Sequence, residues 1–222
     1  MASNPPRNFV RFAPSKADKS RLVDIRITLM TGGDALWWDA RLGPWHARIA
    51  SRADRLWSWS VLLPMCHLVQ LAKRRFCRPL VIWARADNGQ FVRAGMSILI
   101  EQYPYLDVSA PNESHFVWFI SAADSGVLGS RYGVSDPPAL GRVLLDNAIV
   151  LSQNAGLSGR MGLHAAAAGG AGLLTVYVKC GLLQLPATAP LPTSIRRKND
   201  GRFFYADQPV AEALAALLDP AR

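Results

Sequence analysis

The sequence predicts a mixed α/β fold in which a mostly antiparallel central sheet is flanked by helices. Half of the 222 residues are apolar and only 18% are charged, a composition that excludes intrinsic disorder. Segments typical of strands and of helices both alternate and cluster along the chain, which is the pattern of a mixed sheet rather than of a barrel or a sandwich. An Asn-Gly pair between two apolar runs also predicts a β-hairpin.

The N-terminal third begins with a segment over residues 1–20 that is rich in Pro, Ser and Lys, and we expect it to be a loose tail. Residues 22–30 are partly alternating and rich in β-branched side chains, which predicts the first strand. Residues 31–34 then predict a turn that leads into a helix N-cap. The helical pattern of residues 35–76 is broken at Gly43-Pro44 and at Pro64.

The middle of the chain predicts the central strands. Residues 79–86 and 91–102 are apolar runs joined by Asp87-Asn-Gly-Gln90, a hairpin turn that tolerates the positive φ such turns require. Residues 115–122 are mostly apolar and fit a central strand.

The C-terminal half predicts a loop, three helices and two further strands. The Gly- and Ser-rich stretch 123–136 reads as a loop, and Pro137-Pro138 suits the first turn of a helix capped by Ser135 or Asp136. The remaining elements are a helix over 139–154, a strand over 159–164, a helix over 170–179, a strand over 202–206 and a helix over 209–218.

The positive charge of the chain is concentrated near its start. Residues 1–80 carry 14 Lys and Arg against 5 Asp and Glu, a net charge of +9, whereas the rest carries 11 of each. This excess suits an anionic partner such as a nucleic acid or a nucleotide, or else a solvated basic face. Three scattered cysteines without C-x-x-C spacing predict neither a disulfide framework nor a metal site.

The sequence also bears on location. The N-terminus lacks an apolar stretch of signal-peptide length. The few scattered cysteines favour a reducing setting, so we expect a cytoplasmic protein. The most apolar run, residues 56–72, holds Pro64, His67 and Gln70 and is expected to be a buried helix rather than a membrane segment. The motifs G-x-S-x-G and G-x-x-x-x-G-K-[ST] are absent, which argues against a Ser-hydrolase and against a P-loop nucleotidase.

Two motifs in the C-terminal half resemble the GCN5-related N-acetyltransferases. Asp136, Ala139 and Gly141 stand at the positions of the family's Q/R-x-x-G-x-G/A pyrophosphate loop, and only Gly141 agrees well. The run from Leu174 to Leu182 is similar to the family's helix ending in Y-x-K-x-G-F, with Leu182 for Phe. An Asn that is common seven residues before the Tyr is replaced by Gly170.

The resemblance implies a single acetyltransferase-like domain over residues 21–222 that uses acetyl-coenzyme A and no metal. The cofactor's diphosphate would lie at the start of the 139–154 helix, on Ala139, Leu140, Gly141 and Arg142, where backbone N–H groups and the helix dipole attract anions. Ile120, Ser121 and Ala122, at the end of a central strand, would hold the thioester end. The alternative for these residues is an ordinary helix start and an apolar core strand.

The same resemblance implies the catalytic residues. Tyr177 would protonate the departing thiolate, unless it is a core tyrosine with its hydroxyl at the rim. Glu101, at the end of a strand, is the expected general base for the acceptor amine. Glu113, His115 and His164 are rival bases, and a water chain is a further alternative.

The predicted function is transfer of acetyl from acetyl-coenzyme A to an amine by direct attack in a ternary complex. The basic N-terminal region, residues 35–76 above all, favours an anionic acceptor or partner such as an aminoacyl-tRNA, as in the family's toxin members. The alternatives are a non-catalytic binding module of the same fold and a nucleic-acid-binding protein. The basic triplet Arg196–Lys198 is expected to be a solvated loop or a phosphate contact. The clustered N-terminal tryptophans are expected in the core. The oligomeric state is left open, with a homodimer as one alternative.

Overall fold

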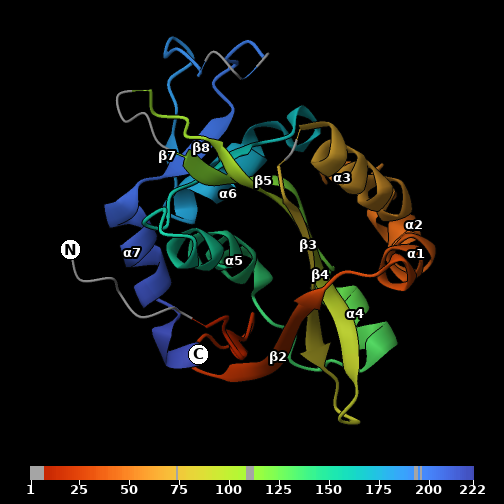
Figure 1. Cartoon of the computed structure of the whole chain (residues 1–222). Coiled ribbons are helices and arrows are strands. Elements are labelled where there is room, and N and C mark those ends of the chain that lie inside the picture. Colours follow the sequence, from red (N-terminus) through yellow and green to blue (C-terminus); the bar gives the residue numbers. More distant parts are fainter. Residues whose placement is uncertain (1–7, 74, 109–112, 193–194, 196) are drawn as a thin grey trace.

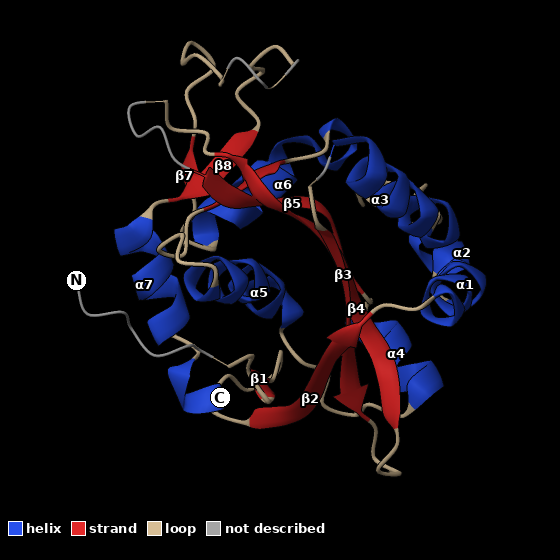
Figure 2. Ribbon diagram, in the orientation of Figure 1, coloured by secondary structure: helices blue, strands red, loops and turns tan. Residues whose placement is uncertain are grey.

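The computed structural model describes residues 8–73, 75–108, 113–192, 195 and 197–222. The described strands form one sheet, flanked by helices on both sides (Figures 1 and 2). Its strands are β1 (Phe12–Pro14), β2 (Leu22–Leu29), β3 (Cys77–Arg85), β4 (Phe91–Pro104), β5 (Glu113–Ala122), β6 (Met161–His164), β7 (Leu183–Gln184) and β8 (Phe203–Ala206). The helices are α1 (Gly32–Arg41), α2 (Gly43–His46), α3 (Trp59–Lys73), α4 (Ser125–Tyr132), α5 (Leu140–Asn154), α6 (Gly170–Lys179) and α7 (Gln208–Ala216), with short 3-10 turns at Ala167–Gly169 and Asp219–Ala221.

The sheet has the strand order β1-β2-β3-β4-β5-β6-β8-β7. Every neighbouring pair is antiparallel except β5 and β6, which run parallel and are connected through α4 and α5. A parallel pair needs a long crossover connection, and α5 supplies it. The predicted fold class, a mixed and mostly antiparallel sheet with flanking helices, is confirmed.

The central strands are apolar on both faces because helices cover both. Consecutive residues of a strand point to opposite faces. In β4, Ile98 belongs to the cluster packed with α1 and α3, and Leu99 to the cluster packed with α5, α6 and α7. Phe203 and Phe204 of β8 divide in the same way. The near-continuous apolar runs of the sequence therefore reflect burial on two sides.

The parallel strands β5 and β6 stay together for only three residue pairs. Their pairing ends at Val117 and Leu163. β6 stops one residue later, whereas β5 continues to Ala122 along β4. Beyond that point the sheet is open between the two strands.

A β-bulge lies at the point where β5 leaves β6. Ile98 of β4 pairs with Phe119, but the next residue, Leu99, pairs with Val117. Trp118 is therefore the extra residue, and its backbone falls outside the regular ladder. A bulge of this kind bends the strand and redirects its side chains.

The predicted helical region over residues 35–76 contains an irregular stretch that the sequence analysis did not anticipate. Residues 47–58, between α2 and α3, form turns and irregular chain. The predicted start of α1 is confirmed, since Thr31 accepts from the Asp34 backbone N–H and the Asp34 carboxylate accepts from the Thr31 N–H. No helix in the described part of the chain is long and apolar enough to cross a membrane.

The expectation of a loose tail over residues 1–20 is wrong for its second half. Residues 1–7 lie outside the described residues, but Phe12–Pro14 pair with β2, and Ser15 forms a bridge with Pro138. Val10 and Ala13 are buried in an apolar cluster that includes Leu140. Few apolar side chains suffice to hold this short segment, so its composition did not reveal it.

Two expectations between β5 and α5 are also corrected. The predicted loop over 123–136 contains α4, which Asp124 caps and Gly133 ends in the left-handed conformation. Neither Ser135 nor Asp136 caps α5: the residue before this helix is Ala139, without a side-chain cap. Asp136 instead accepts a hydrogen bond from the Ser15 hydroxyl and forms an ion pair with Arg21.

Candidate active site

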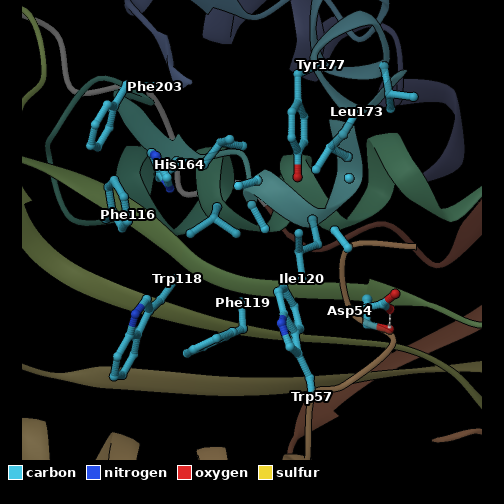
Figure 3. Close-up of a pocket in the computed structure, with 18 of the residues that line it drawn as sticks. Asp54, Trp57, Phe116, Trp118, Phe119, Ile120, His164, Leu173, Tyr177 and Phe203 are labelled. Carbon is cyan, nitrogen blue, oxygen red and sulfur yellow. Dashed lines mark hydrogen bonds between the residues drawn. The ribbon is translucent and has the colours of Figure 1, made fainter. Parts of the chain in front are cut away.

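A cavity of about 1220 Å³ opens where β5 and β6 separate. Its walls come from the second half of β5, the end of β6, helix α6, the irregular stretch 51–57 and the loop before β8. Figure 3 shows the labelled side chains converging on the space between α6 and β5. The cavity exists because the strand pair ends early, so no neighbouring strand fills the opening.

Tyr177 enters the cavity from α6. Its ring packs on Phe204 with a centroid distance of 5.4 Å, and its hydroxyl points across the cavity towards β5 (Figure 3). Burial raises the pKa of Tyr177, and the nearby charges, that of Asp54 among them, act in the same direction. The phenol therefore stays protonated at neutral pH and is available as a proton donor.

The end of β5 forms the opposite wall. Ile120, Ser121 and Ala122, the residues expected at the thioester end of the cofactor, all line the cavity. The bulge at Trp118 lies directly before them. A bulge leaves backbone groups without ladder partners, and an N–H of this kind can donate to a carbonyl oxygen on which negative charge develops.

A buried ion pair from the 51–57 stretch closes this end of the cavity. Arg52 donates to both carboxylate oxygens of Asp54, at 2.8 and 2.6 Å, and also to the Ala122 carbonyl at 2.7 Å. The Ser121 hydroxyl donates to Asp54 as well. Burial alone would raise the pKa of Asp54, but the hydrogen bonds and charge of Arg52, with the Ser121 bond, hold it below its usual value. Asp54 is thus a charged structural anchor.

His164 ends β6 and forms a polar cluster at the other side of the cavity. Its Nε2 lies 3.0 Å from Asp200, and its Nδ1 lies 3.1 Å from Nη1 of Arg197. Since Arg197 donates, the neutral ring accepts at Nδ1 and donates from Nε2 to Asp200. Burial, the largest single effect, would raise the pKa of Asp200, but the hydrogen bonds with His164 and the Arg202 backbone together lower it. The carboxylate fixes the orientation of the ring.

Of the four candidate bases, the structure brings only His164 to the cavity with Tyr177. Glu101 pairs with Arg78, Nε to Oε1 at 2.5 Å, outside the lining. Glu113 is exposed at the start of β5, and His115 is buried on the same strand, outside the cavity lining. The carboxylate that the sequence favoured and the tyrosine are therefore not neighbours.

The start of α5 lies outside the cavity lining and fits a diphosphate in part. The Ala139 N–H is occupied, since it donates to the Pro14 carbonyl at 2.7 Å. The first turn beyond it is accessible, because Gly141 and Arg142 are exposed and a Cβ on Gly141 would meet open space. Arg142 also lies near the end of α6, where its positive charge opposes the burial that raises the pKa of Cys180. Gly141 and Arg142 are thus exposed beside α6, whereas the Ala139 N–H is occupied and Leu140 is buried.

Sequence reasoning missed Arg52, Asp54 and Trp57. All three lie in the stretch 51–57, which carries a helix-like pattern and was assigned to one helical region. The tryptophans were expected in the core, and Trp38 and Trp59 are indeed buried there, but Trp57 lines the cavity. Arg197 and Lys198 of the basic triplet also line the cavity, while Arg196 lies outside the described residues.

No family model and no curated protein matches the chain. Among solved structures, it is similar to a Tyr-to-Phe mutant of the toxin AtaT, bound to the C-terminus of the antitoxin AtaR and acetyl-CoA. The identity is 14% over 86% of this chain and 97% of that chain, with a TM-score of 0.49.

Two further matches have similar coverage. One is spermidine N-acetyltransferase from Vibrio cholerae in complex with CoA and spermine, at 15% identity over 85% of this chain and 98% of that one, with a TM-score of 0.47. The other is the yncA protein from Salmonella typhimurium with its cofactor acetyl-CoA. The identity is 16% over 83% of this chain and 94% of that one, with a TM-score of 0.43. The function proposed below rests on the geometry of this chain.

Proposed function

We propose that the chain is an acyltransferase that moves an acetyl group from acetyl-coenzyme A to an amine. The observation that carries the proposal is the opening between β5 and β6, with the Tyr177 hydroxyl on one side and the bulged strand β5 on the other. Acetyl-coenzyme A supplies an acetyl group activated as a thioester. A donor to the carbonyl and a proton source for the sulfur are the two things that thioester aminolysis needs from a protein.

The roles of the side chains follow from their positions. A backbone N–H of β5 near the bulge donates to the acetyl carbonyl. The amine nitrogen bonds to that carbon as the carbon–sulfur bond breaks, and Tyr177 gives its proton to the sulfur. His164 takes the amine proton at Nδ1, with Asp200 holding Nε2 on the other side of the ring. We place Gly141 and Arg142, on the first turn of α5, at the cofactor's diphosphate.

A binding module without catalysis is the second candidate function, and one observation favours it. The N-terminal segment crosses the start of α5 and takes the Ala139 N–H, a donor that the predicted diphosphate site was expected to use. If this contact prevents cofactor binding, the cavity serves to bind a ligand and performs no transfer.

Two measurements on the full chain separate the candidates. Acetyl-coenzyme A at 100 times its dissociation constant should stabilise the fold by about 2.7 kcal/mol if it binds only the folded state, and thiol release should follow when an amine is added. Absence of any thermal shift at millimolar acetyl-coenzyme A would reject the acyltransferase. A steeply salt-dependent affinity for tRNA, without a cofactor shift, would instead support the nucleic-acid-binding alternative.

A further inference from the structure

The cavity has two chemically different ends. Tyr177, Leu173 and Asp54 lie towards one end, and Phe203, His164 and Phe116 towards the other (Figure 3). The first end holds the proton donor assigned to the thiolate. The second end is therefore where an acceptor would enter.

The acceptor end is built largely from aromatic rings. Tyr103 and Phe116 pack with their ring centroids 4.5 Å apart, and Trp118 and Phe119 with theirs 4.9 Å apart. The His164 ring lies 4.5 Å from that of Phe203. Surfaces of this kind favour a ligand with an aromatic or large apolar group, since stacked and edge-to-face rings attract beyond simple burial.

The charged groups at this end are mainly positive. Arg75 lies over the Tyr103 ring at 5.2 Å, and both Arg75 and Arg197 lower the pKa of Tyr103, which burial as the largest effect raises. Lys198, which follows Arg197 in the loop before β8, also lines the cavity. No acidic partner within ion-pair distance of Arg197 or Lys198 is found in the described part of the chain.

The carboxylates that line the cavity are already paired. Among the described lining residues these are Asp54, held by Arg52 and Ser121, and Asp200, held by His164. A polycationic amine would need unpaired carboxylates and would meet Arg197 and Lys198 instead. The lining thus disfavours a polyamine and favours a ligand with a negative charge of its own.

Resting on the proposed acyl transfer, we propose that the acceptor is an amine that carries both an aromatic group and an anionic group, as an aromatic α-amino acid does. The aromatic group stacks against Trp118 and Phe116. The anion pairs with Arg197, with Arg75 contributing from behind Tyr103.

Arg197 also links recognition of the anion to the general base. Its Nη1 occupies His164 Nδ1, the atom that must accept the amine proton. An anion on the acceptor competes for the same guanidinium and draws it away, which frees the Nδ1 lone pair. An acceptor with an anionic group therefore frees His164 Nδ1 for proton transfer. An amine without such a group leaves Nδ1 hydrogen-bonded to Arg197.

Binding is tested first without catalysis, by calorimetry on the cofactor-free full chain. The probes are indole-3-propionate, which is aromatic and anionic, tryptamine, which is aromatic and cationic, and spermidine. We expect indole-3-propionate to bind at least tenfold more tightly than either amine. Arg197→Ala and Trp118→Ala should each weaken its binding about tenfold or more. The control Arg26→Ala removes an arginine that lies 4.2 Å over the Phe91 ring away from the cavity, and it should leave the affinity unchanged.

Turnover is tested next, by thiol release from acetyl-coenzyme A with tryptophan or tryptamine. The wild type should prefer tryptophan at least tenfold in kcat/KM. Arg197→Ala should lose activity on tryptophan and gain activity on tryptamine, because His164 Nδ1 is then unoccupied. A variant that merely disturbs the loop would lose activity on both.

The outcomes separate the two proposals. Equal or tighter binding of spermidine or tryptamine, or an unchanged affinity in Arg197→Ala, overturns the acceptor assignment even if acetyl is transferred. The expected binding pattern without thiol release from any amine overturns the acyl transfer and leaves the aromatic, anion-binding site in place.

Discussion

Arg52 and Asp54 form a two-point ion pair that fastens an irregular stretch of chain to the end of β5. The carboxylate is 8% exposed and the guanidinium 20% exposed. Because Arg52 also binds the Ala122 carbonyl and Asp54 also binds Ser121, the pair joins two walls of the cavity. The shape of the proposed active site therefore depends on charges that take no part in the chemistry.

The first prediction concerns this pair. Asp54→Asn should lower the free energy of unfolding by about 2–4 kcal/mol, because it leaves a largely buried guanidinium without its counter-charge. Urea denaturation measures the loss. The matched control is Asp24→Asn, which breaks the exposed contact between Arg85 and Asp24 and should cost less than about 1 kcal/mol. Equal costs in the two variants would contradict the anchoring role.

The second prediction concerns pH and His46, which is 2% exposed and lies against Trp38. Burial, with the charge of Arg52, lowers the pKa of His46 from 6.5 to about 4, although Asp54 and Asp124 act in the opposite direction. The unfolded chain thus binds this proton at a higher pH than the folded chain. Stability is fully present above pH 6.5 and falls towards pH 4, by up to about 3 kcal/mol from this group.

The measurement is the free energy of unfolding as a function of pH. His46→Gln should flatten the slope between pH 6.5 and 4, whatever its effect on the absolute value, and buried His115 supplies the slope that remains. His67→Gln, at an exposed position of α3, is the control and should keep the full slope. An unchanged slope in His46→Gln would show that its ring protonates normally in the folded state.

The third prediction tests the proton donor. Tyr177→Phe removes one oxygen from a buried ring, so acetyl-coenzyme A should still raise the melting temperature. Thiol release should fall by roughly 10²-fold or more, the range of a lost general acid. Tyr132→Phe, outside the cavity lining, should behave as the wild type. Full turnover in Tyr177→Phe would remove this hydroxyl from the mechanism.

The fourth prediction tests the base. His164→Gln should lower kcat by roughly 10²-fold with a much smaller change in KM, because the ring is assigned to proton transfer. Asp200→Asn should lower kcat less, since it weakens the orientation of the ring and keeps the acceptor nitrogen. Glu101→Gln serves as the comparison, because the Arg78 pair lies outside the cavity. A larger loss in Glu101→Gln than in His164→Gln would return the base to Glu101.

The fifth prediction concerns the turn between α5 and β6. Gly159 has φ +78°, and a Cβ there would lie 2.7 Å from the Ala211 Cβ of α7. Gly156 has φ +77° with open space around it. Gly156→Ala should cost about 1–2 kcal/mol for the left-handed backbone, and Gly159→Ala should cost clearly more, since α7 must also move. Similar melting temperatures would show that α7 yields without penalty.

Most of the secondary structure follows from local signals. The hairpin at Asn88-Gly89, the capped start of α1 and the strong periodicity of α5 were all predicted and are confirmed. Such features depend on residues within one or two turns of each other. The short strand Phe12–Pro14 and helix α4 were missed because their pairing partners and packing surfaces lie far away in the sequence.

The site was predictable only where one residue carries the signal. Tyr177 was named from its motif, and the structure places it in the cavity. The bonds of Arg52 and Asp54 to Ala122 and Ser121 and the His164–Asp200 pair were not found, because they join segments that meet only in three dimensions. Glu101 was favoured for its place at a strand end, but β4 continues to Pro104 with a register shift between Ile100 and Tyr103, and Arg78 holds the carboxylate.

The extra residue at Trp118 sets the phase of β5. Before it, side chains alternate in step with β4; after it, the alternation is displaced by one position, which lets Trp118 and Phe119 face the cavity in succession. Deletion of Trp118 would leave Val117 paired with Leu99 and Phe119 paired with Ile98, so the pairing would be unbroken and the following residues would keep their faces. Ser121 would still pair with Met96, but the Trp118 ring and the bend that the extra residue introduces would be lost from the wall opposite Tyr177. One inserted residue thus widens this wall of the cavity without altering the register of the strand on either side of it.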